Sequence, residues 1–433
     1  MNYNPQVQYA APEEIRRFQE MRLAETLRHV AASSPFYRRL FASHGIDPFA
    51  VRTIDDLAAL PVTTKEDLQR HNGDFVCVPP HRVIDYVTTS GTLGDPVTFT
   101  LTDSDLSRLA RNEALSFSTA GCGPDDILQL MTTLDRRFMA GLAYFLGARE
   151  LGCGVVRVGN GIPELQWDTI RRTRPTTCVA VPSFLIKLIE FAETTGISYR
   201  ESSLRRAICI GEPLRGADFS LNTLGTRIHE KWPELALHST YASTEMQSSF
   251  TECECGRGGH LQPELIVVEL LDDLDRPVAP GTAGEVTITT LGVEAMPLVR
   301  FKTGDICVAH TGKCDCGRTT PRLSPVLGRK GQMIKFKGTT IYPPAIFDVL
   351  DSVAAISSYV VEVRPGDLGT DSVAVRIHSA DTSDGFVKQL KDIFRARIRV
   401  APEVLFDSAD NISRIQSPPM SRKPKKIVIF DKY

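Results

Sequence analysis

The stretch that decides the fold reads Thr177-Cys-Val-Ala-Val-Pro-Ser-Phe-Leu-Ile-Lys-Leu-Ile-Glu-Phe191 and, after a polar interval, Ala207-Ile-Cys-Ile210. The two short apolar runs predict strands, and residues 184–191 between them predict a helix. The apolar runs at 127–131 and 154–158 continue the same alternation upstream. Strands that alternate with helices in this way indicate a mostly parallel sheet covered by helices, which is an α/β fold.

The segments on either side of this alternation predict other structure. We expect helix over residues 11–45, a capped helix start in Thr63-Thr-Lys-Glu-Asp-Leu68, and an antiparallel β region over 264–309. A new α+β unit begins after Gly328-Arg329, with strands expected at 333–336, 358–364 and 372–378 and helices at 343–352 and 384–398. The sequence therefore predicts two domains: residues 1–328, a large domain of helix-covered mixed sheets with a β subdomain, and residues 329–433, a small α+β domain.

The composition excludes several classes of protein. Of the 433 residues, 42% are hydrophobic and 24% are charged, as in an ordinary globular protein. Lys and Arg number 50 against 52 Asp and Glu, a formal charge of −2, so the surface as a whole is not built to bind nucleic acid. No apolar run approaches the roughly 20 residues that span a bilayer, and Met1-Asn-Tyr-Asn-Pro-Gln-Val7 lacks the layout of a signal peptide. We expect a cytoplasmic protein without nucleic-acid or membrane partners.

Three short segments carry groups suited to a phosphorylated nucleotide. The glycines and hydroxyls of Tyr86-Val-Thr-Thr-Ser-Gly-Thr-Leu-Gly-Asp-Pro96 could bring several donors to phosphate oxygens, although the Gly-Lys-Ser/Thr ending of a Walker A loop is absent. The last residue of Ser239-Thr-Tyr-Ala-Ser-Thr-Glu245 could hold Mg²⁺, and that of Leu298-Val-Arg-Phe-Lys-Thr-Gly-Asp305 could accept hydrogen bonds from ribose hydroxyls. Each segment has an ordinary alternative: a hairpin turn, a helix N-cap with an acidic first turn, and an Asp in a turn.

The order and spacing of these segments resemble the adenylate-forming (acyl-CoA synthetase) superfamily. The resemblance rests on Thr88-Thr-Ser-Gly-Thr92, Gly211-Glu-Pro213, Tyr241-Ala-Ser-Thr-Glu245, Arg300-Phe-Lys-Thr-Gly-Asp305, Gly328-Arg329 and a Lys near the C-terminus. Other segments are similar to the branch of phenylacetate–CoA ligase and coenzyme F390 synthetase: Ser34-Pro-Phe-Tyr-Arg-Arg-Leu-Phe41, Leu60-Pro-Val-Thr-Thr-Lys-Glu-Asp-Leu68, Glu294-Ala-Met-Pro-Leu-Val-Arg300 and Cys316-Gly-Arg-Thr-Thr-Pro-Arg322. Together they cover nearly the whole chain.

The resemblance implies a two-step reaction. A carboxylate attacks the α-phosphate of Mg·ATP to give an acyl-adenylate and pyrophosphate, and a thiol, usually that of coenzyme A, then displaces AMP. Two anions meet in the first step, so the site must supply donors and cations. The implied protein is an ATP-dependent carboxylate–CoA ligase, active on an aryl or arylacetic acid such as phenylacetate and similar to relatives that form homodimers. Two alternatives stay open: another acceptor, either a carrier-protein thiol or an F420-type deazaflavin, or a catalytically silent zinc- and nucleotide-binding module.

The resemblance also assigns residues of the large domain. They are Ser90, Gly91, Thr92 and Gly94 at the β- and γ-phosphates; Gly211, Glu212 and Pro213 along the adenine; Tyr241, stacked on the adenine, with Ala242 and Ser243; Thr244 at the α-phosphate; Glu245 at Mg²⁺; and Asp305 at the ribose. Ala242 stands where a Gly is common, and its methyl group would narrow the acyl channel. The identity of the acid therefore stays open.

In the same resemblance, the small domain is a mobile lid that turns about a hinge near Gly331. It brings in Lys423, the catalytic cation between the carboxylate and the α-phosphate. Arg329 supports the ribose and phosphate. After the turn, Lys337 and Gly338 reach the tunnel of the thiol.

The ten cysteines divide into two groups. Six lie scattered and are expected in the core, whereas four form the pairs Cys253-Glu-Cys255 and Cys314-Asp-Cys316. Clustered cysteines in a reducing compartment indicate a metal, and a structural Zn²⁺ needs four nitrogen or sulfur ligands. With His260 the pairs offer five candidates, and the resemblance selects Cys253, His260, Cys314 and Cys316, with Cys255 as a bystander. Ligation by four cysteines and plain reduced thiols are the alternatives.

Overall fold

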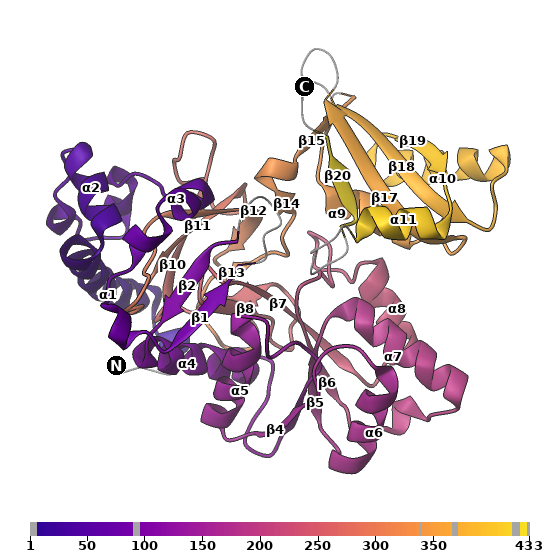
Figure 1. The fold of residues 1–433 in the computed structure, drawn as a ribbon, viewed down its shortest axis with the longest axis horizontal. Coiled ribbons are helices and arrows are strands. Elements are labelled where there is room, and N and C mark those ends of the chain that lie inside the picture. Colours follow the sequence, from indigo (N-terminus) through magenta and orange to yellow (C-terminus); the bar gives the residue numbers. More distant parts are fainter. Residues whose placement is uncertain (1–6, 90–95, 338, 366–370, 418–424, 431–433) are drawn as a thin grey trace. The chain divides into compact units, whose positions relative to one another are not determined.

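The computed structural model describes residues 7–89, 96–337, 339–365, 371–417 and 425–430 (Figure 1). The chain divides into two compact units. The first consists of Met1–Leu221 and Gly225–Val326, and the second of Asn222–Leu224 and Leu327–Tyr433. Parallel and antiparallel sheets with helices packed on them confirm the predicted α/β class. The predicted roles of the two parts, a site-bearing body and a mobile lid, stay predictions.

The alternating segment of the first unit forms a sheet with the strand order β4-β3-β5-β6-β7-β8. Its strands are β3 (Ile127–Leu130), β4 (Gly154–Arg157), β5 (Thr177–Ala180), β6 (Arg206–Cys209), β7 (Ala236–Ser243) and β8 (Ser248–Thr251). All neighbours pair in parallel except β7 and β8, which form an antiparallel hairpin. The four apolar runs identified in the sequence are therefore strands β3 to β6.

Five helices belong to this alternation: α4 (Asp103–Thr119), α5 (Met139–Leu151), α6 (Pro163–Thr173), α7 (Pro182–Thr195) and α8 (Thr223–Lys231), whose first two residues group with the second unit. The connection from β3 to β4 runs in one direction across the sheet, and the following connections run in the other. Right-handed crossovers then place α5 on one face and the later helices on the opposite face. In agreement, α4 packs against α5, and α6 packs against α7.

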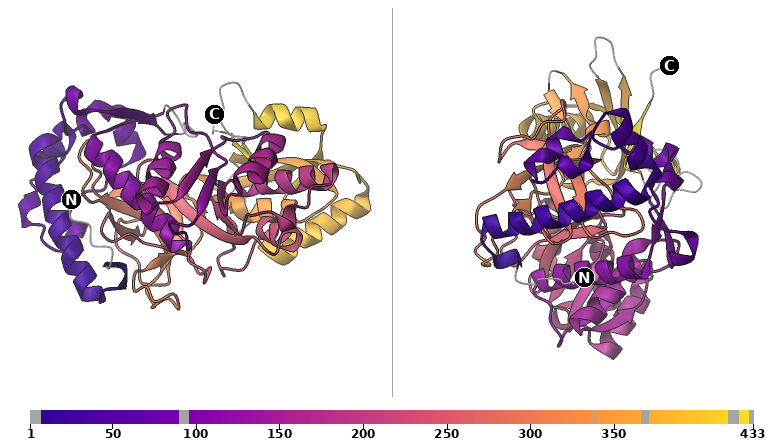
Figure 2. Two further views of the ribbon diagram at one scale, coloured as in Figure 1. Left: turned by 90° about the horizontal axis from the view of Figure 1, so that it is seen from below. Right: turned by 90° about the vertical axis from the view of Figure 1, so that its left-hand side faces the viewer.

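A second, antiparallel sheet of the first unit has the order β10-β11-β12-β13-β9. Its strands are β9 (Gly259–His260), β10 (Ile266–Leu271), β11 (Ala283–Thr290), β12 (Phe301–His310) and β13 (Arg322–Leu323). Helix α1 (Pro12–Ser33) lies across this sheet, as Figure 2 shows, and buries Leu23 and Leu27 against it. A separate hairpin joins β1 (Asp85–Thr88) to β2 (Thr98–Leu101).

The N-terminal helical region differs from the single helix that we expect over residues 11–45. It consists of α1 and α2 (Pro35–Ser43), separated at Ser34, whose backbone is extended. Pro35 lacks the N–H that would continue α1, and the Ser34 side chain caps α2 instead. Helix α3 (Lys65–Arg70) begins with a capping box between Thr64 and Asp67, as its sequence predicts. Among the described residues, no helix is both long and apolar enough to cross a membrane.

Short 3₁₀ helices connect these elements. They are η1 (Val7–Tyr9), η2 (Pro48–Ala50), η3 (Asp55–Ala59), η4 (Asn72–Phe75), η5 (Pro80–Arg82) and η6 (Tyr199–Glu201) in the first unit, and η7 (Lys330–Gln332) in the second.

The second unit contains a sheet with the order β19-β18-β17-β20. The helices and strands of the second unit as a whole are β14 (Gly328–Arg329), β15 (Ile334–Phe336), β16 (Thr339–Ile341), α9 (Pro343–Asp351), β17 (Ile356–Pro365), β18 (Asp371–Ser379), α10 (Asp384–Ile398), β19 (Glu403–Phe406), α11 (Ala409–Gln416) and β20 (Ile427–Ile429). Phe386, Leu390 and Phe394 recur along one face of α10 and are buried with Val361 and Val375 of the sheet. This unit therefore has a core of its own.

Candidate active site

Two of the predicted nucleotide segments, residues 211–213 and 241–245, lie at one edge of the central sheet. Strands β5, β6 and β7 are parallel neighbours, so their carboxyl ends share that edge. Residue 183 follows β5, residues 211–213 follow β6, and residues 244 and 245 follow β7. Open α/β sheets bind their ligands at this edge. The fold therefore gathers segments that are far apart in the sequence.

Glu212 is fixed by the N-terminus of α7. Its two carboxylate oxygens accept hydrogen bonds from the backbone N–H of Ser183 at 2.9 Å and from the Ser183 hydroxyl at 3.0 Å. A negative charge is favourable at the first turn of a helix. Gly211 before it has φ 77°, a left-handed conformation that glycine adopts without strain. The Glu212 side chain therefore joins two loops, while Gly211 and Pro213 remain exposed.

Tyr241 and Asp305, both predicted at the nucleoside, contact each other. The Tyr241 hydroxyl donates to Oδ2 of Asp305 at 2.8 Å, which links β7 of one sheet to β12 of the other. Asp305 is 6% exposed. Burial, and then the charge of Asp305, hold the pKa of Tyr241 well above its usual range, so the phenol stays a neutral donor. The structure thus brings together two predicted residues that are 64 positions apart.

Glu245, the predicted Mg²⁺ ligand, has a cationic partner that the sequence did not reveal. Nζ of Lys65 donates to Oε1 of Glu245 at 2.7 Å, and the two side chains are 31% and 12% exposed. Lys65 is the first residue of α3, directly after the Thr64 cap. It lies inside a segment that carries the family resemblance, but no local pattern relates it to a residue 180 positions away.

Arg108 of α4, a second residue that the sequence did not reveal, supports the turn that carries Thr244 and Glu245. Its fully buried guanidinium donates to the carbonyl oxygens of Gln247 at 2.7 Å, Leu265 at 2.6 Å and Leu291 at 2.8 Å. The Ser243 hydroxyl closes the same turn by accepting the Met246 N–H at 3.2 Å. Charge-assisted hydrogen bonds of this kind are strong. They fix the end of the β7–β8 hairpin.

A buried acid lies behind the same hairpin. Glu113 of α4 is 5% exposed and accepts a hydrogen bond from Asn112 at 2.9 Å. Asn112 also donates to the hydroxyl of Ser249, the residue opposite Ala242 in the β7–β8 register. Burial raises the pKa of Glu113 to about 8. The carboxyl group is therefore largely protonated at neutral pH.

The remaining predicted residues fall into two groups. Ser90, Gly91, Thr92, Gly94, Gly338 and Lys423 lie outside the described residues. Arg329, in β14, and Lys337 belong to the second unit, and both are exposed. Nζ of Lys337 donates to the Ala401 carbonyl at 3.2 Å. The roles of all these residues in nucleotide, CoA and acid chemistry stay predictions.

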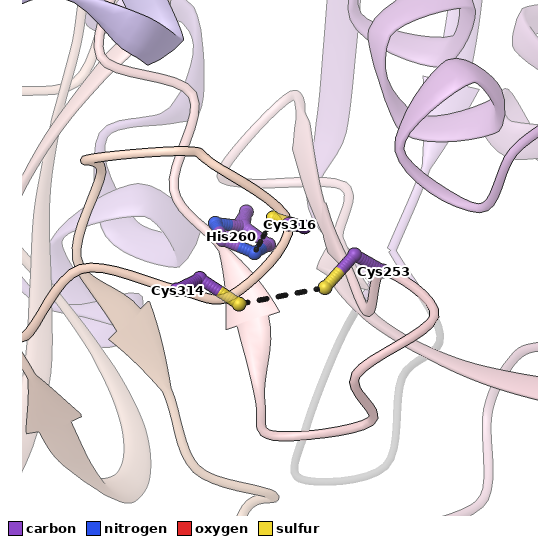
Figure 3. A group of neighbouring side chains, drawn as sticks. All are labelled: Cys253, His260, Cys314 and Cys316. Atoms are coloured by element: carbon purple, nitrogen blue, oxygen red, sulfur yellow. Dashed lines mark hydrogen bonds between the residues drawn. The ribbon is translucent and has the colours of Figure 1, made fainter.

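The four predicted zinc ligands converge (Figure 3). The ligand atoms of Cys253, His260, Cys314 and Cys316 all lie within 4.8 Å of one another. The two sulfurs of Cys253 and Cys314 are 3.7 Å apart, and the Cys316 sulfur is 3.5 Å from Nε2 of His260. A tetrahedral Zn²⁺ with ordinary bond lengths separates two sulfurs by about 3.8 Å and a sulfur from a nitrogen by about 3.6 Å. The donors therefore fit such an ion.

The surroundings of the four side chains suit a metal as well. Nδ1 of His260 lies 3.0 Å from the Thr320 hydroxyl, which leaves Nε2 directed at the sulfurs. Burial, and then the charges of Arg318 and Arg322, lower the pKa of His260 to about 3, so the imidazole is neutral, as a ligand must be. Cys255 is partly exposed and lies outside this group of four.

The metal-site loops also reach the start of the described chain. Nε of Arg318 donates to Oε1 of Gln8 at 2.9 Å. The amide of Gln8, which is 3% exposed, in turn donates to the side chain of Gln262. The beginning of the first unit is thereby joined to the segments that carry His260 and Cys316.

Comparison with known proteins gives a family match and close relatives. Residues 17–295 match the family described as AMP-binding enzyme. The phenylacetate-coenzyme A ligase of Thermus thermophilus is 32% identical over 389 residues, which cover 87% of this chain and 84% of the relative. The phenylacetate-coenzyme A ligase of Escherichia coli K12 is 28% identical over 424 residues, 94% of each chain.

A solved structure supports the fold independently. Crystalline 2-hydroxyisobutyryl-CoA ligase, in the postadenylation state in complex with R3-HIB-AMP, superposes with a TM-score of 0.85. The superposition covers 98% of this chain and 92% of the other, at 22% identity. At that level of identity the likeness concerns the fold alone.

Proposed function

The chain belongs to the AMP-binding (adenylate-forming) enzyme family, in the branch of the phenylacetate–CoA ligases, and from this we propose that it joins a carboxylic acid to CoA with ATP. The acid that we propose is phenylacetate or a related aryl or arylacetic acid. Acid and ATP give an acyl-adenylate and pyrophosphate, and CoA then replaces AMP. Likeness to phenylacetate–CoA ligases along nearly the whole chain is the observation that carries this proposal.

The site contacts support a division of labour in the first step. The Tyr241–Asp305 pair would present one aromatic ring and one carboxylate to a nucleoside, since ring and carboxylate already lie side by side. Residues 211–213 would line the adenine with main chain, because the Glu212 carboxylate is bound to Ser183. Thr244 would touch the α-phosphate, and Ala242 and Ser243 would border the acyl-adenylate. Ser90, Gly91, Thr92 and Gly94 would bind the outer phosphates.

Charge at the reacting centre would come from both units. Glu245 would hold Mg²⁺, which neutralises phosphate charge when it is bound. Lys65 contacts the same carboxylate and would keep it oriented. Lys423 would approach the carboxylate and the α-phosphate, and Arg329 the ribose. Lys337 and Gly338 would serve the thiol step.

We further propose that Cys253, His260, Cys314 and Cys316 hold a structural Zn²⁺. Four protein ligands would complete a tetrahedron, so the ion would fix loops and take no part in the reaction. None of the ten cysteines forms a disulfide, which suits a reducing compartment such as the cytoplasm. The resemblance also implies a homodimer, which light scattering at several protein concentrations would test.

The test of the activity measures the two half-reactions separately. ATP–pyrophosphate exchange is recorded with benzoates, phenylacetates and short fatty acids, and thioester formation with CoA follows for the best acid. We expect exchange to be fastest with an aryl or arylacetic acid, and CoA to release AMP. Exchange without CoA turnover would favour a carrier protein or a deazaflavin as acceptor, and no exchange with any acid would favour a silent binding module.

A further inference from the structure

The second unit has a basic groove, and of its wall residues only Lys337 has a role in the steps above. Its volume is about 520 Å³, and its wall consists of Lys337, Lys391, Arg395, Arg399, Val400, Ala401, Pro402 and Glu403. All eight residues belong to the second unit, so the groove is complete within it. Four cations face one acid, and the wall therefore has an excess of three positive charges.

The geometry of α10 explains why the cations gather. Lys391, Arg395 and Arg399 are four positions apart, and each step of four residues turns a helix by only about 40°. They form a stripe about 12 Å long beside the buried face of Phe386, Leu390 and Phe394. Arg399 follows the last helical residue with φ 66°, and the chain then turns into residues 400–403 to close the groove.

The cations of the stripe are weakly neutralised by the protein. Arg395 donates to Asp392 at 2.6 Å, but both side chains are 57% exposed, and a surface pair of this kind contributes little. Within the described residues, neither Lys391 nor Arg399 forms an ion pair. Nζ of Lys337 bonds one carbonyl oxygen and lies 4.8 Å from the ring centre of Phe336, which leaves it two further protons to donate. The groove therefore suits a ligand with several negative charges.

We propose that this groove binds the 3′-phosphate and the diphosphate of CoA. The inference rests on the proposed function, whose two phosphorylated substrates are ATP and CoA. The predicted contacts of the β- and γ-phosphates of ATP are residues 90–94, outside the groove, whereas Lys337, which lines the groove, is itself predicted at the thiol tunnel. Arginine and lysine recognise phosphate by charge-assisted hydrogen bonds, and a stripe of about 12 Å is long enough for two phosphate positions.

Charge reversal in the full-length enzyme tests the assignment. Lys391→Glu and Arg399→Glu, singly and together, are compared with Arg414→Glu, an exposed position on α11 outside the groove. We expect the double variant to raise the KM for CoA at least tenfold. The KM for pantetheine, which carries no phosphate, should change less than twofold, and 3′-dephospho-CoA should show an intermediate effect. Arg414→Glu should match the wild type.

Direct binding separates this inference from the proposed reaction. Calorimetry with adenosine 3′,5′-bisphosphate needs no turnover, and we expect the double variant to bind it at least tenfold more weakly than the wild type. If the wild type does not turn over CoA but binds the bisphosphate through these residues, CoA is refuted as the acceptor, while the groove is still supported as a phosphate-binding site. An unchanged affinity, or equal losses with CoA and pantetheine, would refute the groove.

Discussion

The two units use charge in opposite ways. In the first unit, the charged groups of the candidate site already have partners within the protein: Asp305 accepts from Tyr241, Glu245 from Lys65, and Glu212 from Ser183. In the second unit, three like charges stand along one face of α10. Paired groups support the structure as well as the proposed chemistry, whereas the cations along α10 would serve only the ligand that we propose for the groove. Substitutions should therefore couple stability to activity in the first unit and separate them in the second.

Loss of a metal ligand should give the largest effect, and it would test the expectation that stability and activity are coupled in the first unit. We expect Cys314→Ser, or removal of the ion by a chelator, to lower the free energy of unfolding by several kcal/mol and to abolish exchange, because two loops lose their common anchor. Calorimetry and metal analysis measure both effects. Cys255→Ser is the matched control and should behave as the wild type. A metal-free protein with unchanged melting temperature and full activity would contradict the structural role.

Substitution of Lys423 would test the expectation that activity can be lost without loss of stability in the second unit. We expect Lys423→Ala to slow ATP–pyrophosphate exchange roughly 100-fold or more, because it removes a cation from the transition state. Thiolysis of preformed acyl-adenylate should be nearly unchanged, and so should the melting temperature. Lys425→Ala, two positions away, is the control. Equal loss in both half-reactions would argue against a lysine that serves adenylation alone.

Substitution of Arg108 alone should lower both stability and activity. Arg108→Met keeps the aliphatic length but leaves three buried carbonyl oxygens without their donor, at a cost of about 3 kcal/mol. Because the turn with Glu245 loses its support, the KM for ATP should rise as well. Urea unfolding and exchange kinetics measure the two effects, with the exposed Arg17→Met as control. A stability loss with unaltered kinetics would separate Arg108 from the site.

Substitution of Glu113 should affect stability alone, and it is the only one of these changes whose effect depends on pH. Its pKa is about 8 when folded and near 4.5 when unfolded, so the native state keeps a proton that the unfolded state releases between these values. Stability contributed by this group is therefore present below pH 4.5 and is lost as the pH rises toward 8. Relative to the wild type, Glu113→Gln should gain roughly 3 kcal/mol between pH 5 and pH 8.

Chemical unfolding at several pH values measures the gain. The exposed Glu164→Gln should show none, and a difference that is independent of pH would mean that Glu113 is ionised in the native protein.

The sequence predicted what depends on local pattern. Helix α10 spans the expected residues 384–398, and the apolar runs became β3 to β6, because periodicity and capping act over a few residues. The break between α1 and α2 also has a local signal, Ser34 before Pro35, which outweighs the apolar spacing.

The supporting contacts of the site were not predictable in this way. Lys65 and Glu245 are 180 positions apart, and Arg108 bonds carbonyl oxygens up to 183 positions away. Every residue has a backbone carbonyl, so the sequence does not indicate which carbonyl oxygens accept hydrogen bonds from Arg108. The sequence around Lys65 likewise does not distinguish it from any other lysine at the start of a helix. Such pairs are fixed by the packing of whole elements, which a single sequence does not display.

Gln8 carries a consequence for the synthesis of the protein. This buried amide finds its partners 254 and 310 positions later in the chain. A ribosome makes all of the intervening chain before Arg318 exists, so through most of translation the Gln8 amide bonds water and cannot be buried against this native partner. We expect nascent chains arrested before residue 318 to remain open to protease near Gln8, and those arrested well beyond it to become protected.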